Sequence, residues 1–350
     1  MNTLLSFSGC RCSLRTATVL FASLALLSCA SQQHPEPQST ALSDPLPSWN
    51  DTEAKKKIVA FVHAVVDRDA ASFVPEEERI AVFDNDGTLW VEQPIYTQLA
   101  FAVARIRELS AQHPEYKTTQ PYKAVLEEDW QAVLKSGTEG FAKILFASHA
   151  NLDIDAFQES VTRWLAHAMH PRFKRRYTEM VYQPQLELLR YLRANGFKTY
   201  IVSGGGTEFL RAWTEPTYGI PPERTIGSTL GLEYRVADGE PELVRTPKIE
   251  FNDDKEGKPI SIHRYIGRRP IFAFGNSDGD FEMLMWTTHN KEHPTLGMIV
   301  HHDDPVREYA YDRESHVGTL DRGLDAAESE GWLIVSMKND WRSLFSSNAK

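Results

Sequence analysis

Side chains capable of hydrolytic chemistry occur at three places in the chain, each directly after a short apolar run. Asp84 and Asp86 stand two residues apart, and Gly87 permits a tight bend beside them. The other two places are the runs Ser203-Gly204-Gly205-Gly206 and Gly275-Asn276-Ser277-Asp278-Gly279-Asp280. A short apolar run that opens into acids or glycine is typical of a buried strand followed by a loop.

These three turns are expected to converge on one site, because ligands of open α/β sheets bind beyond the carboxyl ends of the strands. Carboxylates at Asp84, Asp278 or Asp280 supply the oxygen ligands that Mg²⁺ prefers. The hydroxyl and backbone amides of Ser203 and Gly204 suit phosphoryl oxygens. Two carboxylates beside a metal can divide the work, one attacking phosphorus and the other handling the proton of the leaving group.

The elements that must position these groups alternate between strand and helix, which predicts an α/β fold with a Rossmann-like parallel sheet and right-handed crossovers. One block, residues 96–177, shows helical spacing of its apolar residues throughout and no strand. We therefore expect an all-helical cap domain over 96–177, inserted into an α/β core domain made of residues 51–95 and 178–350.

The order of the motifs resembles that of the haloacid dehalogenase superfamily. Residues 84–88, Asp-Asn-Asp-Gly-Thr, are similar to its first motif, DxDGT, and Ser203 after an apolar strand is similar to the second. Lys258, followed by a helix and a strand, resembles the third motif, and residues 275–280 resemble the fourth, usually written GDxxxD. A helical cap after the first motif resembles the phosphoserine-phosphatase-like branch.

The resemblance implies a role for each matching residue. Asp84 would attack phosphorus and become an aspartyl phosphate. Asp86 would protonate the leaving oxygen and later activate the hydrolytic water. Ser203 would bind the phosphoryl group, and Lys258 would hold the phosphate and the nucleophile by charge. Mg²⁺ would be held by Asp84, the backbone carbonyl of Asp86 and the fourth motif.

The fourth motif departs from the family pattern, because Asn276 stands where the family has its first aspartate. We expect Asn276 to act with Asp280 as metal ligands, with Asp278 as a second candidate. On this basis Asn276→Asp should be tolerated, since it restores the common ligand. Lys248 and Lys255 compete with Lys258 for the third motif, but Lys258 directly precedes the expected helix.

Four residues outside the motifs are less clearly assigned. His301 and His302 follow an apolar run; they could line the rim of the site, but they are more typical of a surface loop. Trp90 and Glu92 follow the first motif and are equally compatible with substrate contact and with packing.

The first 28 residues are typical of an export signal. They carry Arg11 and Arg15, no acid, and an apolar run over residues 17–27 that is too short to span a bilayer comfortably. We therefore expect residues 1–28 to be removed as a signal peptide.

The end of that segment, Leu26-Leu27-Ser28-Cys29, resembles the bacterial lipobox, which implies lipidation of Cys29. Residues 29–50 are rich in Pro, Gln and Ser and are expected to form a flexible tether. Ala30, rather than an aspartate, follows the cysteine. In a Gram-negative host this predicts an extracytoplasmic protein, anchored by its lipid in the outer membrane and facing the periplasm.

The composition restricts the function further. The formal net charge of -10 gives no support to nucleic-acid binding. The expected function is a Mg²⁺-dependent phosphomonoester hydrolase of broad scope that acts on small phosphorylated substrates. A phosphoserine-specific phosphatase and a non-catalytic lipoprotein that binds metal or phosphate are the alternatives. Asp86 argues against a carbon–halogen hydrolase, which needs no acid at that position.

Overall fold

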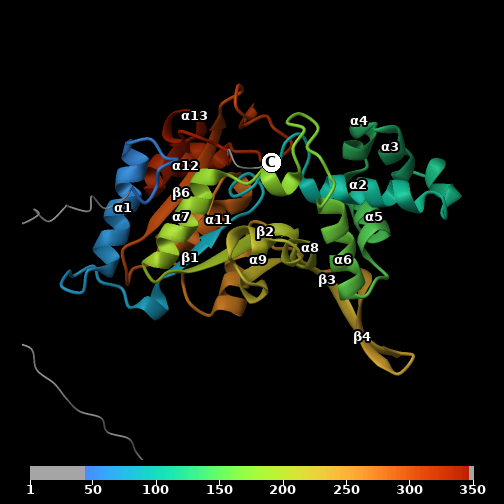
Figure 1. Cartoon of the computed structure of the whole chain (residues 1–350), viewed down its shortest axis with the longest axis horizontal. Coiled ribbons are helices and arrows are strands. Elements are labelled where there is room, and N and C mark those ends of the chain that lie inside the picture. Colours follow the sequence, from blue (N-terminus) through green and yellow to red (C-terminus); the bar gives the residue numbers. More distant parts are fainter. Residues whose placement is uncertain (1–43, 347–350) are drawn as a thin grey trace, which may run out of the picture. The chain divides into compact units, whose positions relative to one another are not determined.

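The computed structural model describes residues 44–346, so the predicted signal peptide and Cys29 lie outside the described residues. The described part contains an eight-stranded sheet with the order β4-β3-β2-β1-β5-β6-β7, and β8 pairs with β6 (Figure 1). The strands are β1 Ile80–Phe83, β2 Lys198–Gly206, β3 Thr225–Ala237, β4 Glu240–Phe251, β5 Phe272–Gly275, β6 Leu296–Asp303, β7 Ala310–Tyr311 and β8 Leu333–Ser336.

The centre of the sheet is parallel. β1 pairs with β2 on one side and with β5 on the other, and Phe83 is in register with Ile201 and Phe274. β3 pairs with β2 and β6 with β5, also in parallel. The α/β fold class with a mostly parallel sheet, predicted from the sequence, is confirmed.

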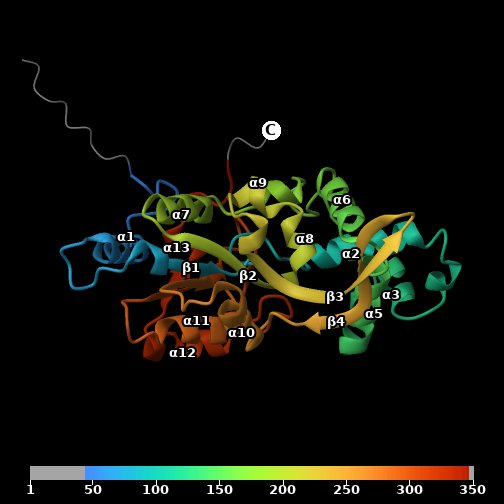
Figure 2. The ribbon, with the colours of Figure 1, turned by 90° about the horizontal axis from the view of Figure 1, so that it is seen from below.

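Helices cover both faces of the sheet (Figure 2). Ala81 and Phe83 of β1 join a core cluster that includes apolar residues of α1 and α7. Ile80 and Val82 face the other way and pack with residues of α11 and α12. This alternation follows from the two-residue period of a strand. The covering helices are α1 Glu53–Val66, α7 Gln183–Ala194, α10 Gly257–Ser261, α11 Phe281–Thr288, α12 Arg322–Glu330 and α13 Met337–Asp340.

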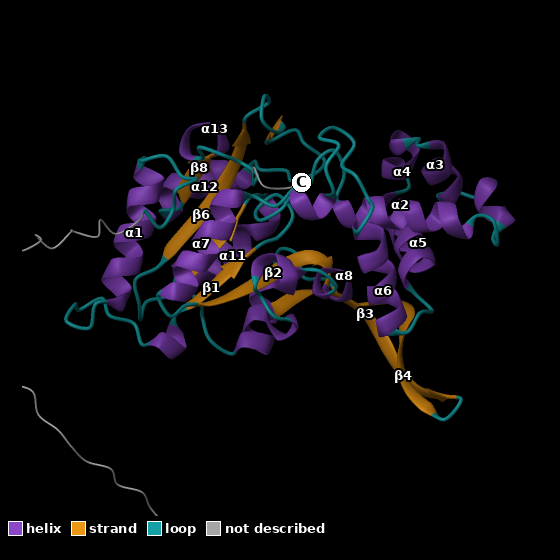
Figure 3. Ribbon diagram, viewed as in Figure 1, coloured by secondary structure: helices purple, strands orange, loops and turns teal. Residues whose placement is uncertain are grey.

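A helical block follows the first strand, where the sequence predicted one (Figure 3). Its helices are α2 Thr97–Leu109, α3 Tyr122–Glu127, α4 Trp130–Lys135, α5 Gly137–His149 and α6 Ile154–Leu165. α2 to α5 enclose a small apolar core that includes Val103, Ile106 and Val125. Two further helices follow β2, α8 Thr207–Arg211 and α9 Thr214–Tyr218. Short 3₁₀ turns lie at Glu76–Glu78, Pro114–Lys117, Tyr177–Glu179, Pro222–Arg224 and Asp278–Asp280, and a π-helical turn at Ile262–Ile266.

The long antiparallel hairpin of β3 and β4 was not predicted. Its strands turn at Asp238 and Gly239, and it extends beside the helical block. The amide of Asn151 donates to the carbonyl of Arg245, whose own amide donates to the carbonyl of Leu152. β4 carries two prolines and many charged residues, so its sequence lacks the apolar alternation that reveals a half-buried strand.

Residues 44–50 belong to the folded unit rather than to the tether predicted over 29–50. Leu46 and Trp49 are fully buried, and the Trp49 indole N–H donates to the carbonyl of Pro184 at 3.0 Å. Trp49 also packs edge-on against Trp341. Burial of these apolar side chains outweighs the low structural propensity of the surrounding Pro and Ser. Within residues 44–346, none of the helices has the length and apolar character that a membrane span requires.

Candidate active site

The polar turns after β1, β2 and β5 meet because these three strands are neighbours at the centre of the sheet. Asp84 directly follows β1, and its amide donates to the carbonyl of Phe274 in β5 at 3.0 Å. The structure therefore places the first, second and fourth motifs side by side, as the parallel arrangement of their strands requires.

Lys258 joins the turns through its ammonium group. Its Nζ lies 2.7 Å from Oδ1 of Asp84 and 2.6 Å from Oδ1 of Asp280, and it donates to the carbonyl of Val202 at 2.9 Å. All three charged side chains are buried. Because ion pairs that are shielded from water are little screened, Lys258 fixes the position of the Asp84 carboxylate.

Of the three lysines that compete for the third motif, only Lys258 reaches Asp84. Lys248 lies on β4 and forms an exposed ion pair with Glu250 at 2.7 Å. Lys255 is exposed in the turn before α10. The placement of Lys258 depends on α10, which begins at Gly257 and brings the lysine under the end of β2.

The two aspartates of the first motif have different surroundings. Burial raises the pKa of Asp84 well above its ordinary value, and the nearby Asp280 raises this pKa further while Lys258 opposes the shift. Asp86 keeps part of its surface exposed, and burial raises its pKa to about 6. A pKa near the working pH suits a general acid that must also act as a base, so Asp86 fits that task.

The second-motif turn lies against Asp86. Ser203 is buried, and its hydroxyl accepts from the amide of Gly205 at 3.1 Å. A methyl group built on Gly205 would lie 3.3 Å from Oγ of Ser203 and 3.6 Å from Oδ2 of Asp86. The exposed backbone at Gly204 continues this turn. The Ser203 hydroxyl and the backbone of this turn thus lie beside the Asp86 carboxylate, and hydroxyl and amide groups suit phosphoryl oxygens.

Asp280 organises the fourth motif. Its Oδ2 accepts from the amides of Asn276 at 2.9 Å and Ser277 at 3.1 Å, while its Oδ1 faces Lys258. Gly275 is required beside it, because a Cβ there would lie 2.4 Å from the Cβ of Asp280. Both oxygens of Asp280 therefore have partners within the protein.

Asn276 is held between the first motif and a buried acid. Its Oδ1 accepts from the hydroxyl of Thr88 at 3.0 Å, and its Nδ2 donates to Oε1 of Glu92 at 2.8 Å. The hydroxyl of Tyr311 donates to the same Glu92 oxygen at 2.8 Å. Burial raises the pKa of Glu92 well above its ordinary value. Glu92, whose role the sequence left open, is thus packed within the site.

Asp278 is directed elsewhere. Its carboxylate accepts from the amides of Asp321, Arg322 and Gly323 at 2.8–3.1 Å. These amides belong to the N-terminal end of α12, where a carboxylate is the favoured partner. The geometry therefore favours Asn276 over Asp278 as the metal ligand of the fourth motif.

The donor set suits a hard divalent cation. Among the described residues, no three His, Cys, Asp or Glu side chains already surround one point as metal ligands. Nevertheless, in the described part of the site four acids, Asp84, Asp86, Asp280 and Glu92, accompany one cation, Lys258. Oxygen donors with surplus negative charge fit Mg²⁺. The groups that would hold it are Asp84, the carbonyl of Asp86 and Asn276.

The prediction of a surface loop is wrong for His302. β6 continues through both histidines to Asp303, so His302 points inward and is buried. Its Nε2 donates to the carbonyl of Gly87 at 2.8 Å, and its Nδ1 lies 3.2 Å from Glu308. His301 points the other way, 3.3 Å from Asp312. Continuing the strand alternation beyond Val300 would have identified the buried histidine.

The helical block contributes one residue to the site that the sequence did not reveal. Gln98 of α2 accepts from the amide of Gly206 at 2.8 Å through Oε1, and its Nε2 lies 3.0 Å from Nε2 of His149. A methyl group on Gly205 would lie 3.4 Å from Gln98 Oε1. A lone glutamine on a helix carries no sequence signal for such a contact.

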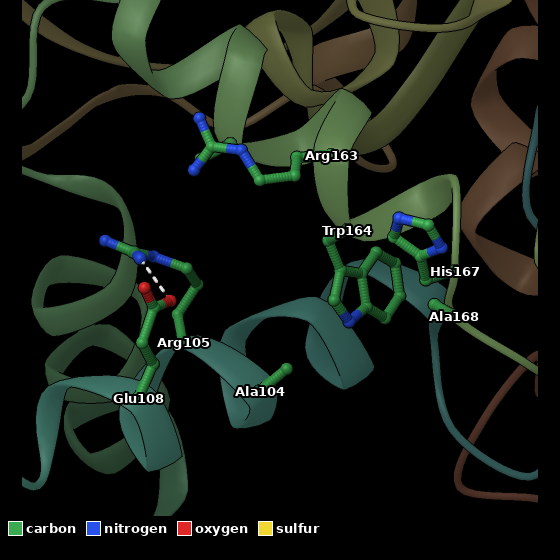
Figure 4. Close-up of a pocket in the computed structure, with 8 residues that line it drawn as sticks. Ala104, Arg105, Glu108, Arg163, Trp164, His167 and Ala168 are labelled. Atoms are coloured by element: carbon green, nitrogen blue, oxygen red, sulfur yellow. Dashed lines mark hydrogen bonds and ion pairs between the residues drawn. The ribbon is translucent and has the colours of Figure 1, made fainter.

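The helical block also has a hollow of about 340 Å³ between α2 and α6 (Figure 4). Arg105, Arg163 and His167 line it together with Trp164, and Arg105 pairs with Glu108 at 2.5 Å. None of the residues that line the hollow belongs to the three strand-end turns. We therefore place the chemistry at the turns and not in this hollow.

Comparisons with known proteins bear on the family. A comparison with curated protein sequences finds no match. A protein of unknown function from Bordetella pertussis Tohama I is 18% identical, with 74% of this chain and 98% of that chain covered and a TM-score of 0.46. A functionally unknown protein from Anaerococcus prevotii DSM 20548 is also 18% identical, with 72% and 86% covered and a TM-score of 0.47.

A third solved structure, of a phosphoserine phosphohydrolase-like protein from Francisella tularensis subsp. tularensis SCHU S4, is 16% identical, with 72% and 98% covered and a TM-score of 0.35. The family model described as haloacid dehalogenase-like hydrolase matches residues 81–285, which is more than half of the chain and contains all four motif positions. The chain therefore belongs to the haloacid dehalogenase-like hydrolase family.

Proposed function

We propose that this hydrolase cleaves phosphomonoesters through an aspartyl-phosphate intermediate. The observation that carries the proposal is the buried Asp84 carboxylate, held by Lys258 through Oδ1 at the point where the three turns meet. Its Oδ2 has no hydrogen bond within the described residues. Asp86 and Ser203 lie around the adjoining Gly205 turn. A fixed nucleophile beside a separate acid–base group is the arrangement that covalent phosphoryl transfer needs.

In the first step, Oδ2 of Asp84 attacks phosphorus, and the bond from phosphorus to the leaving oxygen breaks. Asp86 gives its proton to that oxygen, so the alcohol leaves neutral. The Ser203 hydroxyl and the amide of Gly204 bind the phosphoryl oxygens, and Lys258 keeps the Asp84 carboxylate oriented during the attack. When bound, Mg²⁺ would offset the negative charge shared by Asp84 and the phosphoryl group.

In the second step, the deprotonated Asp86 takes a proton from water. The water oxygen bonds to phosphorus, and the bond between phosphorus and Asp84 breaks. Inorganic phosphate leaves, the Asp84 carboxylate is regenerated and Asp86 is protonated again. A partly exposed Asp86 suits this double use, because both the leaving group and the water must reach it.

We expect the purified protein to hydrolyse p-nitrophenyl phosphate with Mg²⁺ and to lose this activity in EDTA. Restoring Mg²⁺ should restore turnover, because the surplus of buried carboxylates repels a phosphate dianion in the absence of a cation. Full activity in EDTA would contradict the metal requirement. Release of halide from 2-haloacids without phosphate release would replace the proposal with the carbon–halogen alternative.

The substrate scope follows from the proposed location. An extracytoplasmic phosphatase that acts on many phosphomonoesters fits better than a phosphoserine-specific biosynthetic enzyme. The intact set Asp84, Asp86, Ser203 and Lys258 argues against a non-catalytic lipoprotein. Turnover of a panel of phosphomonoesters that includes phosphoserine distinguishes these alternatives.

We also propose that Cys29 carries a lipid that anchors the protein to the outer membrane. The support is the lipobox-like Leu26–Cys29 sequence, which precedes the described residues. Cys29→Ser should prevent incorporation of labelled palmitate and release the protein from the membrane fraction. A wild-type protein that takes up no label and stays in the soluble fraction would contradict the anchor.

A further inference from the structure

Glu92 is a buried carboxylate that has no ion pair within residues 44–346. It is 2% exposed, and its hydrogen-bond donors are the neutral groups of Asn276 and Tyr311. Removing an ionised carboxylate from water without a cation beside it is unfavourable by a large amount. In the absence of a cation this burial favours the neutral form of Glu92, and a divalent cation at the neighbouring site would favour the carboxylate.

Asn276 provides the link between Glu92 and the proposed metal site. It stands where the fourth motif of the family carries an aspartate, so its side chain lacks the negative charge of the usual ligand. Donation from Nδ2 to Glu92 directs Oδ1 the opposite way, toward the hydroxyl of Thr88 in the first motif. A hydrogen bond to a carboxylate also polarises the amide and increases the negative charge on its oxygen.

Two glycines show that the pair has a fitted place in the fold. A Cβ on Gly87 would lie 2.4 Å from Oε1 of Glu92 and 2.1 Å from Nδ2 of Asn276. A Cβ on Gly318 would lie 1.9 Å from the same Glu92 oxygen. Both glycines have positive φ angles, of 78° and 66°. The first-motif loop and the loop after β7 therefore close around the pair without room for any side chain.

We propose that Glu92 and Asn276 together replace the single metal-binding aspartate of the fourth motif. Glu92 supplies the negative charge and fixes the amide, and Asn276 presents its oxygen to the divalent cation. Glu92 is thus a positioning residue that acts through Asn276. This inference rests on the proposed function, because it requires a metal ion at this site. It concerns only the binding of the cation, and not the turnover of substrate.

The pair can be tested without any substrate by measuring how tightly the full chain binds Mn²⁺. The electron paramagnetic resonance signal of the free ion reports the amount of Mn²⁺ that stays unbound. Glu92→Gln should weaken Mn²⁺ binding by about 10–100-fold, as the loss of a group that orients a metal ligand commonly does. Asn276→Asp alone places two carboxylates where a hydrogen bond was, so its metal-free form should melt at a lower temperature than the wild type. On this proposal, Asn276→Asp is less well tolerated than the sequence alone predicts.

The decisive variant is the double substitution Glu92→Gln/Asn276→Asp, which exchanges the acid and the amide. It should recover most of the Mn²⁺ affinity that Glu92→Gln loses, because one negative charge and one amide donor are again paired. The double variant should also fold, since it retains both partners of the hydrogen bond. Tyr311→Phe is the matched control: it removes a donor to Glu92 but keeps its charge, and it should bind Mn²⁺ nearly as the wild type does.

The inference would be overturned by unchanged Mn²⁺ affinity in Glu92→Gln, by a double variant no better than Glu92→Gln, or by a wild type that binds no Mn²⁺. A loss in Tyr311→Phe equal to that in Glu92→Gln would also overturn it, because packing alone would then account for both. Because Mn²⁺ binding is read without substrate, a wild type that hydrolyses no phosphomonoester would refute the proposed function and leave this result standing.

Discussion

Replacing Asp84 with asparagine should lower the turnover of p-nitrophenyl phosphate by roughly 10⁴–10⁶-fold, the range seen when a catalytic nucleophile is removed. The amide has the same shape as the carboxylate, and its oxygen can still accept from Lys258, which now lies 2.7 Å from Oδ1. The fold should therefore survive. Turnover should be lost, because a neutral amide cannot attack phosphorus to form an acyl phosphate.

The matched control is Asp86→Asn, two residues along the same turn. It keeps the nucleophile and removes the proton carrier, so turnover should fall by about 10²–10⁴-fold. The loss should be smaller for substrates with good leaving groups, which need little protonation in the first step. Intact-mass spectrometry after a rapid quench should detect a phosphoryl group on the Asp84 peptide of Asp86→Asn and none in Asp84→Asn. A label on a serine or histidine, or an active Asp84→Asn, would refute the mechanism.

The convergence of the motifs could be predicted because it follows from local patterns and one topological rule. The apolar runs before Asp84, Ser203 and Asn276 are short and end in glycine-rich turns, so their strands were visible in the sequence. Parallel neighbours present their carboxyl ends at the same edge, which brings those turns together. Lys258 could be selected because the sequence predicts a helix directly after it, although α10 already begins at Gly257.

The partners of these residues could not be predicted, because they come from distant segments by tertiary packing. Nothing in the sequence near Glu92 pairs it with Asn276, which lies 184 residues away. The same holds for Gln98 and Gly206, which are joined across 108 residues. The hairpin of β3 and β4 was missed because its strands are largely exposed and carry charges at positions that a buried strand would fill with apolar residues.

Lys258→Met should lower the free energy of unfolding by about 3–5 kcal/mol, the usual cost of removing one partner from a buried ion pair. Lys258 is the cation within hydrogen-bond distance of both Asp84 and Asp280, and all three side chains are buried. Without it, two buried carboxylates lose the cation that lies between them. Thermal unfolding followed by circular dichroism, in EDTA so that no added cation compensates, measures the loss.

Lys248→Met is the control for the loss of a lysine as such. Lys248 pairs with Glu250 on the exposed hairpin, so its replacement should change stability by less than about 0.5 kcal/mol.

A second variant shows whether the cost arises from uncompensated charge or from lost packing. Asp280→Asn, added to Lys258→Met, removes the negative charge that lies 2.6 Å from the former ammonium group. The asparagine oxygen can still accept from the amides of Asn276 and Ser277, which now bind Oδ2 of Asp280. If charge is the cause, the double variant should be more stable than Lys258→Met, although it removes one more native group. Equal or lower stability would assign the lost free energy of unfolding to packing. Lys258 would then stabilise the fold mainly through packing contacts and not through its charge.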